Sequence, residues 1–337
     1  MGLTKIIKGL TLRAWRSAVG WSFFATGLRF AGFVLVLPLM LRTLSPEELG
    51  FWYTILALTG LTNFIYLGFS PMVQRAAAFF WAGAEKFEAM GFVVKPSNST
   101  VSPNYGSLQE LTSTMRILYL LLGILCFVFL ALLGTPWIES SVLGDEEVRN
   151  AMRVWWIVIL FAAYNVAGSF WNNLLSGINK VREAQVIFLI ALSANYFLVC
   201  LGLLLGWGLF APLIGMITEA FLTRELGKQK FLRSIPDDYR DVSWNFKHQM
   251  VNVFWPNAWR IGAVAGGSYF ISNSKRIVAG EYLDLALVGS LGISLQLIMA
   301  IRQVSAVWFQ VKIPLLSQMR VRAEQDQIKA LFLQRLR

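Results

Sequence analysis

Eight long apolar stretches constrain the fold of this 337-residue chain more than any other feature of its sequence. A helix that rises 1.5 Å per residue needs about 20 residues with few or no charges to cross the hydrocarbon core of a bilayer. The stretches are residues 18–41, 49–68, 117–133, 154–175, 184–205, 209–226, 252–272 and 285–308. We therefore predict an all-α, polytopic membrane protein with eight transmembrane helices, and residues 328–336 predict the start of a ninth.

Composition and charge distribution agree with this prediction. The chain is 56% hydrophobic and 15% charged, whereas a typical soluble domain is about 25% charged. Lys and Arg concentrate in alternate loops, and the intervening loops contain only Arg42, Arg149, Arg153, Lys275 and Arg276. Because basic residues are retained on the cytoplasmic side, this alternation predicts a cytoplasmic N-terminus. The net charge of +11 is thereby explained without nucleic acid as a partner.

Two long polar segments lie on the predicted cytoplasmic side. In the first, residues 73–116, the pattern Ser107-x-x-Glu110 predicts a cap for the helix that leads into the third span. The second separates six predicted spans from two. We predict a cytoplasmic interfacial segment (1–17), a first six-helix lobe (18–226), an inter-lobe linker (227–250) and the start of an incomplete second lobe (251–337).

Arg29 and Arg260 lie deep within apolar stretches. A charge at the bilayer centre costs roughly 2.5–3.5 kcal/mol on insertion scales, so such residues usually face protein or a water-filled cavity. Glu219 is the carboxylate inside a span that can pair with one of them, but one acid cannot neutralise both. A guanidinium left in a cavity offers a planar fork that matches phosphate oxygens. Arg224 and Arg302 lie nearer cytoplasmic ends, where a long side chain can reach the headgroups.

The amide side chains of Asn257, Asn172 and Asn173 can bind sugar hydroxyls, although hydrogen bonds between helices are the commoner use of such residues. In the seventh stretch, Pro256 predicts a broken helix, and Gly262-x-x-x-Gly266 predicts the close approach of a neighbour. The segment WPNAWRIGAVAGG, residues 255–267, is thus predicted to form one wall of a cavity of the kind that transporters build from broken helices.

Signatures of catalysis are missing from the sequence. It has no phosphate-binding glycine loop and no His-Glu-x-x-His motif, and its one histidine is His248 in a predicted cytoplasmic loop. Cys126 and Cys200 lie in separate spans without metal-like spacing and are interpreted as small buried hydrophobic residues. We predict a protein that is not an enzyme and that needs neither cofactor nor metal.

Three segments also resemble a known family. They are RTLSPEELGFWYTILALTGLTNFIYLGFSPMVQRAAAFFWAGA, NNLLSGINKVREAQ, and WPNAWRIGAVAGGSYF with the following GSLGISLQLIMAIRQVSAVWFQVKIPLLSQMR. All three are similar to polysaccharide-exporting flippases of the Wzx-like branch of the MOP (multidrug, oligosaccharidyl-lipid, polysaccharide) superfamily. The resemblance implies a bacterial inner-membrane protein with two six-helix lobes around a central cationic cavity, of which this chain stops about four helices short.

The same resemblance implies a substrate and partners. Members of this family move an undecaprenyl-diphosphate-linked oligosaccharide from the cytoplasmic to the outer leaflet, among membrane lipids, a polysaccharide polymerase and other assembly proteins. By this analogy Arg29 and Arg260 bind the diphosphate, and Asn257, Asn172 and Asn173 bind the sugars. Two alternatives remain: a cation-coupled multidrug exporter of the same superfamily, and a membrane-embedded glycan polymerase or acyltransferase.

Overall fold

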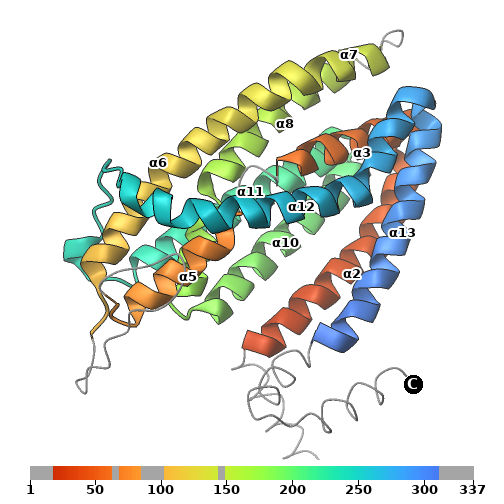
Figure 1. Cartoon of the computed structure of the whole chain (residues 1–337). Coiled ribbons are helices and arrows are strands. Elements are labelled where there is room, and N and C mark those ends of the chain that lie inside the picture. Colours follow the sequence, from red (N-terminus) through yellow and green to blue (C-terminus); the bar gives the residue numbers. More distant parts are fainter. Residues whose placement is uncertain (1–17, 63–67, 85–101, 143–148, 311–337) are drawn as a thin grey trace, which may run out of the picture. The chain divides into compact units, whose positions relative to one another are not determined.

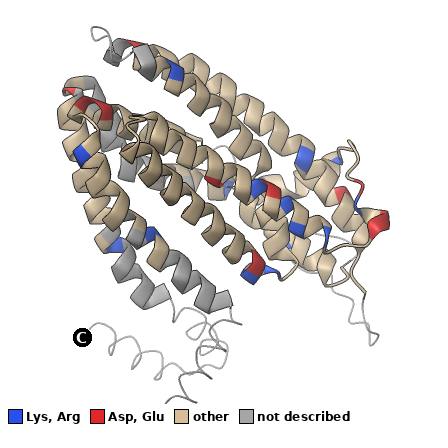
Figure 2. Ribbon diagram, turned by 180° about the vertical axis from the view of Figure 1, so that it is seen from behind, with Lys and Arg blue, Asp and Glu red and all other residues tan. Residues whose placement is uncertain are grey.

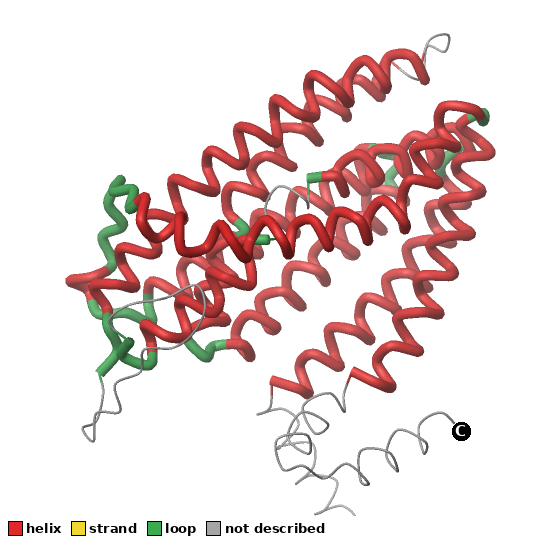
Figure 3. The backbone as a smooth tube through the Cα atoms, viewed as in Figure 1, coloured by secondary structure: helices red, strands yellow, loops and turns green. Residues whose placement is uncertain are grey.

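The structure is a computed structural model that describes residues 18–62, 68–84, 102–142 and 149–310. Every regular element among these residues is helical (Figures 1 and 3). The helices are α2 (Ala18–Thr43), α3 (Pro46–Leu61), α5 (Phe69–Trp81), α6 (Tyr105–Phe129), α7 (Thr135–Val142), α8 (Arg149–Gly168), α9 (Phe170–Gly177), α10 (Val181–Leu204), α11 (Phe210–Leu232), α12 (His248–Tyr282) and α13 (Leu285–Gln310). The predicted all-α class is confirmed for the described residues.

Three continuous helical stretches in the described part of the chain are long and apolar enough to cross a membrane: Tyr105–Glu139, Met152–Gly177 and Val181–Leu204. The first joins α6 to α7 through a π-helical turn at Leu130–Gly134. In Figure 2 most of the helical length is free of charged residues, which gather mainly near helix ends and in the connections. The protein is therefore a membrane protein, while the count of eight spans stays a prediction.

Helix boundaries differ from the boundaries of the apolar stretches. α6 begins at Tyr105, well before the apolar stretch that starts at residue 117. The predicted cap at Ser107 is wrong, because Asn104 is the N-cap and its Oδ1 accepts the Ser107 backbone N–H at 3.0 Å. A complete capping box instead begins α3, where Ser45 and Glu48 bond each other's backbone N–H groups. Polar first turns extend these helices beyond their apolar cores.

The predicted break at Pro256 is also wrong, because α12 is one continuous helix from His248 to Tyr282. Nor does a neighbour approach Gly262, since a Cβ placed there would meet no described atom within 4 Å. The close approach is found at Gly68 instead, where an added Cβ would lie 1.9 Å from the carbonyl oxygen of Ala258. The small residue that lets α12 pack closely is therefore on the partner segment rather than on α12.

The described helices pack in pairs, with α10 against both α2 and α11, α6 against α8, and α5 against α9. A tight turn joins α10 to α11 at Gly206 and Gly208, whose φ values of 76° and 54° suit glycine. One buried core includes Trp155, Ile159 and Leu130, and a second includes Phe170, Phe231 and Tyr119. α12 contacts α3, α5 and α6.

The chain divides into two compact units, residues 1–289 and 290–337. The first contains α2 to α12 and the start of α13, and the second contains the remainder of α13. The predicted linker is shorter than residues 227–250, because α11 continues to Leu232 and α12 starts at His248. The interfacial segment 1–17 and the ninth helix at 328–336 lie outside the described residues, and the division into two lobes stays a prediction.

Candidate functional site

Arg29 belongs to a polar cluster at which α2, α10 and α11 converge. Its guanidinium carbon lies 4.6 Å from the ring centroid of Phe188 on α10. The Glu219 carboxylate, on α11, is near enough to interact electrostatically with Arg29. Glu219 also accepts a hydrogen bond from the side-chain amide of Asn195 on α10. The cluster therefore places a cation near an acid, and an amide side chain bonds that acid.

Two glycines allow the three helices to meet at this level. Gly32 lies one turn after Arg29, and a Cβ placed on it would lie 2.0 Å from the Tyr196 ring. Gly215 lies one turn before Glu219, and a Cβ there would lie 2.3 Å from the Asn195 side-chain oxygen. Because side chains at these positions would separate the backbones, the glycines on α2 and α11 permit close contact with α10.

Arg29 and Glu219 differ in exposure. The Arg29 side chain is exposed, whereas Glu219 is half-buried among the helices. The guanidinium of an arginine keeps its charge in proteins. Part of the guanidinium therefore remains available to an external anion, while Glu219 and the Phe188 ring stabilise its position.

Arg260 has a different environment. It is exposed on α12, and its guanidinium carbon lies 5.9 Å from the ring centroid of the adjacent Trp259. Among the described residues it forms no ion pair, and no hydrogen bond or ring contact joins it to Arg29. The structure thus does not bring the two predicted diphosphate ligands into direct contact.

The three predicted sugar-binding amides are placed unequally. Asn257 is half-buried on α12, one turn before Arg260. Asn172 packs against Gly227 of α11, and its buried Oδ1 has no hydrogen-bond partner within the described ranges. Asn173 donates to the backbone carbonyl of Ser169 in its own helix, at 3.4 Å. Only Asn257 shares a helix with one of the predicted diphosphate ligands.

A second polar cluster was missed by sequence reasoning. Arg224 does not extend freely, because its guanidinium carbon lies 4.0 Å from the Tyr164 ring centroid and Nη1 donates to the Tyr164 carbonyl at 3.3 Å. Glu225 completes the cluster, 3.5 Å from Arg224 Nε and 3.3 Å from the Tyr164 hydroxyl. Gly168 makes room for the Arg224 stem. Tyr164 and Arg224 are distant in sequence, so their pairing had no local signal.

The part of the chain that the structure describes contains no group of three His, Cys, Asp or Glu residues arranged to hold a metal ion. Cys126 and Cys200 are free thiols, the first buried and the second half-buried. The groups of the Arg29 cluster, a guanidinium, a carboxylate and an amide, offer ionic recognition and hydrogen bonding.

Comparison with known proteins adds one structural similarity. No family model matches the sequence, and no curated protein matches it. A solved structure described as the inward-facing conformation of a multidrug resistance MATE family transporter of the MOP superfamily is similar, with a TM-score of 0.51 and 14% sequence identity. The chain has the fold of a MATE transporter.

This similarity covers 86% of the present chain and 65% of the MATE transporter. The chain thus spans about two thirds of the length of the protein that it matches. At 14% sequence identity the similarity concerns the fold alone. The Wzx-like branch and the identity of a substrate stay predictions.

Proposed function

We propose that the protein is a flippase that moves an undecaprenyl-diphosphate-linked oligosaccharide from the cytoplasmic to the outer leaflet of a bacterial inner membrane. The observation that carries this proposal is the exposure of two guanidinium groups, Arg29 and Arg260, on helices of a MATE-type transporter fold. Cations placed within apolar helices are costly, and ligand binding is a common reason for keeping them. A diphosphate is the anion that planar guanidinium groups match best.

In the proposed cycle the lipid tail remains in the bilayer, and the cationic side chains neutralise the diphosphate while access alternates between the two faces of the membrane. Arg260 binds a phosphate oxygen directly, because no carboxylate among the described residues competes for it. Arg29 contributes a charge that Glu219 keeps in position. Asn257, one turn from Arg260, contacts the first sugars, and Asn172 and Asn173 are the other candidate sugar ligands.

The proposed activity requires no catalytic residue, cofactor or metal. The N-terminus is cytoplasmic, and the partners are the lipid-linked oligosaccharide, the surrounding lipids, a polysaccharide polymerase and other assembly proteins that act on the translocated unit. The cytoplasmic N-terminus is inferred from the positive-inside pattern, and the substrate and partners are inferred from the family resemblance.

The test is the fate of the lipid-linked oligosaccharide in cells that lack the gene. We expect complete repeat units to accumulate on their lipid carrier in the cytoplasmic leaflet while surface polymer disappears, and the intact gene should restore the polymer. Reconstituted full-length protein should in addition move a labelled lipid-diphosphate oligosaccharide across a liposome bilayer. Normal delivery of the units to the outer leaflet in the deleted strain would refute the proposal.

Multidrug export is the second candidate function. The similar solved structure is described as a multidrug resistance transporter, and Glu219 provides an intramembrane carboxylate that could attract a cationic drug. Overexpression would then confer resistance to cationic drugs, and Glu219→Gln would remove it. Multidrug export would be favoured over the flippase if overexpression confers resistance and deletion of the gene leaves surface polymer unchanged.

A further inference from the structure

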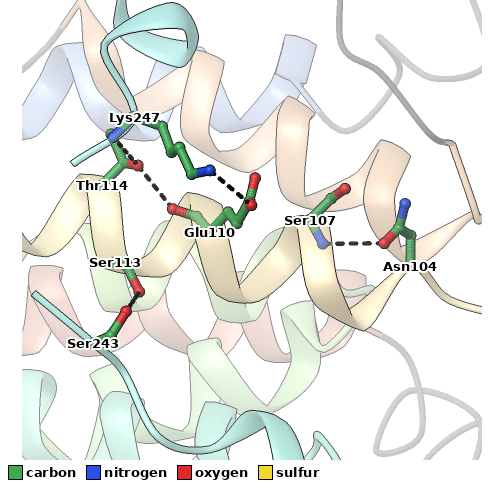
Figure 4. Close-up of polar contacts among 7 residues, drawn as sticks. All are labelled: Asn104, Ser107, Glu110, Ser113, Thr114, Ser243 and Lys247. Carbon is green, nitrogen blue, oxygen red and sulfur yellow. Dashed lines mark hydrogen bonds and ion pairs between the residues drawn. The ribbon is translucent and has the colours of Figure 1, made fainter. Parts of the chain in front are cut away.

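The segment between α11 and α12, residues 233–247, lies along the first part of α6 (Figure 4). We call this segment the strap. Gln109 Nε2 donates to the carbonyl of Asp241 at 2.6 Å, and Arg116 Nη1 donates to the carbonyl of Val242 at 2.8 Å. The hydroxyls of Ser113 and Ser243 lie 3.4 Å apart. Three consecutive strap residues are thus bonded to three side chains of one helix.

The last residue of the strap is held twice. The backbone N–H of Lys247, the N-cap of α12, donates to Thr114 Oγ1 at 3.2 Å. Its Nζ lies 3.2 Å from Glu110 Oε1 (Figure 4). Since both partners lie on α6, the start of α12 is fixed to α6 by the main chain and by a side chain.

Aromatic rings and a further arginine hold the remainder of the strap. The Arg116 guanidinium carbon lies 4.0 Å from the Trp244 ring centroid, and Tyr239 stacks on Tyr105 at a centroid separation of 5.5 Å. Arg240 Nε donates to the carbonyls of Leu232 and Ile235. The strap is therefore fastened to the end of α11 as well as to α6.

The first turns of α12 are also packed against neighbouring segments. Phe254 and Ala258 are buried, and Gly68 lies against the Ala258 carbonyl. Beyond them the environment changes, because Gly262 and Gly267 face open space among the described residues and Val264 is 72% exposed. Among the described residues, Ile261 is the last residue of α12 that packs against the second core. Ala279, near the end of the helix, is buried outside that core.

We propose that the strap stays closed on α6 throughout the transport cycle, so that residues 248–261 move with the helices before them as one body. The linker that the sequence marks as the boundary between lobes is then not a hinge. Movement of the later part of the chain takes place beyond Ile261. The transport arm of the test rests on the proposed flippase function, and the exchange arm does not.

The transport arm uses a reversible cross-link in the full-length protein. Ser113→Cys and Ser243→Cys, introduced together after Cys126→Ala and Cys200→Ala, place two thiols where the hydroxyls are 3.4 Å apart. We expect oxidation to form the disulfide with no loss of substrate translocation in proteoliposomes. Failure of the disulfide to form, or a block that a reductant reverses, would overturn the proposal. Proteoliposomes that translocate nothing even when reduced would count against the flippase function instead.

The exchange arm measures amide hydrogen exchange of residues 241–247 without any substrate. Arg116→Gln removes both the hydrogen bond to Val242 and the contact with Trp244. We expect exchange in the strap to become faster by on the order of tenfold, which is the effect of losing about 1.4 kcal/mol of local stability. The matched control is Arg153→Gln at an exposed position of α8, which should leave strap exchange unchanged. Equal exchange in both variants and the parent protein would overturn the proposal.

Discussion

Arg29 and Arg260 are the same residue type in similar apolar stretches, yet their side chains have different environments. Arg29 lies over the Phe188 ring beside Glu219, whose carboxylate is held by Asn195. Within the described ranges, the ring contact of Arg260 is with its own neighbour Trp259. Arg29 lies where three helices meet, near the carboxylate of Glu219. Arg260 is exposed on α12.

Whether the charge of such an arginine has a nearby counter-charge therefore depends on neighbouring helices rather than on the local sequence. α10 and α11 bring an amide and a carboxylate to α2 because glycines let them approach closely. On α12, a Cβ added at Gly262 or Gly267 would meet no described atom within 4 Å, and Val264 is exposed. A cation without a counter-charge is the stronger candidate for binding an anionic substrate.

The largest effect is expected from Arg260→Ala. Loss of a charge-assisted hydrogen bond to phosphate, worth about 1.5–3 kcal/mol, should reduce translocation roughly ten- to a hundredfold. Surface polymer and lipid-linked intermediates are measured together with the amount of protein in the membrane. Arg260→Lys is the matched control and should retain part of the activity, because it keeps the charge without the planar fork. Unchanged polymer in Arg260→Ala would remove this residue from the site.

A smaller effect, on stability, is expected from Glu219→Gln. Removing the acid leaves the Arg29 charge uncompensated, which should destabilise the protein by about 1–3 kcal/mol, less than for a fully buried pair because Arg29 is exposed. Thermal unfolding in detergent measures the change. The double variant Arg29→Gln with Glu219→Gln should recover part of the loss, as expected when two mutated groups interact. Strictly additive effects would show that the pair does not interact.

The smallest effect is expected from Gly262→Ala on the open part of α12. Alanine favours a helix interior over glycine by about 0.5–1 kcal/mol, and no described atom would clash with the added methyl group. The unfolding midpoint should rise slightly. The same replacement at Gly32 should lower it, because the methyl group would overlap the Tyr196 ring. A fall in both variants would show that Gly262 is packed against a neighbour after all.

Much of the fold could be predicted from the sequence, because apolar length and the glycine turn at 206–208 are local properties. Pro256 misled the prediction because one missing backbone hydrogen bond does not break a helix that packing holds in place. Ser107 misled it because Asn104, three residues earlier, is an equally suitable cap. Both errors arose where two local signals compete and tertiary contacts decide between them.

The candidate site was predictable only in part. Arg29, Arg260 and Glu219 could be selected because charged residues are rare in apolar stretches. Asn195, Tyr196 and Gly32 were not selected, because each is an ordinary residue of a membrane helix and acquires its role only beside another helix. The Tyr164–Arg224–Glu225 cluster was missed for the same reason.

The sequence by itself determined that this protein is helical and membrane-embedded, because apolar length and the distribution of charge can be judged without knowing which helices meet. It also identified the charged residues that lie within apolar stretches. Only the tertiary structure decided which charge is compensated, that α12 is continuous, and that the strap is bound to α6. Those outcomes depend on contacts between residues far apart in the chain, such as Arg116 with Val242 and Gly68 with Ala258.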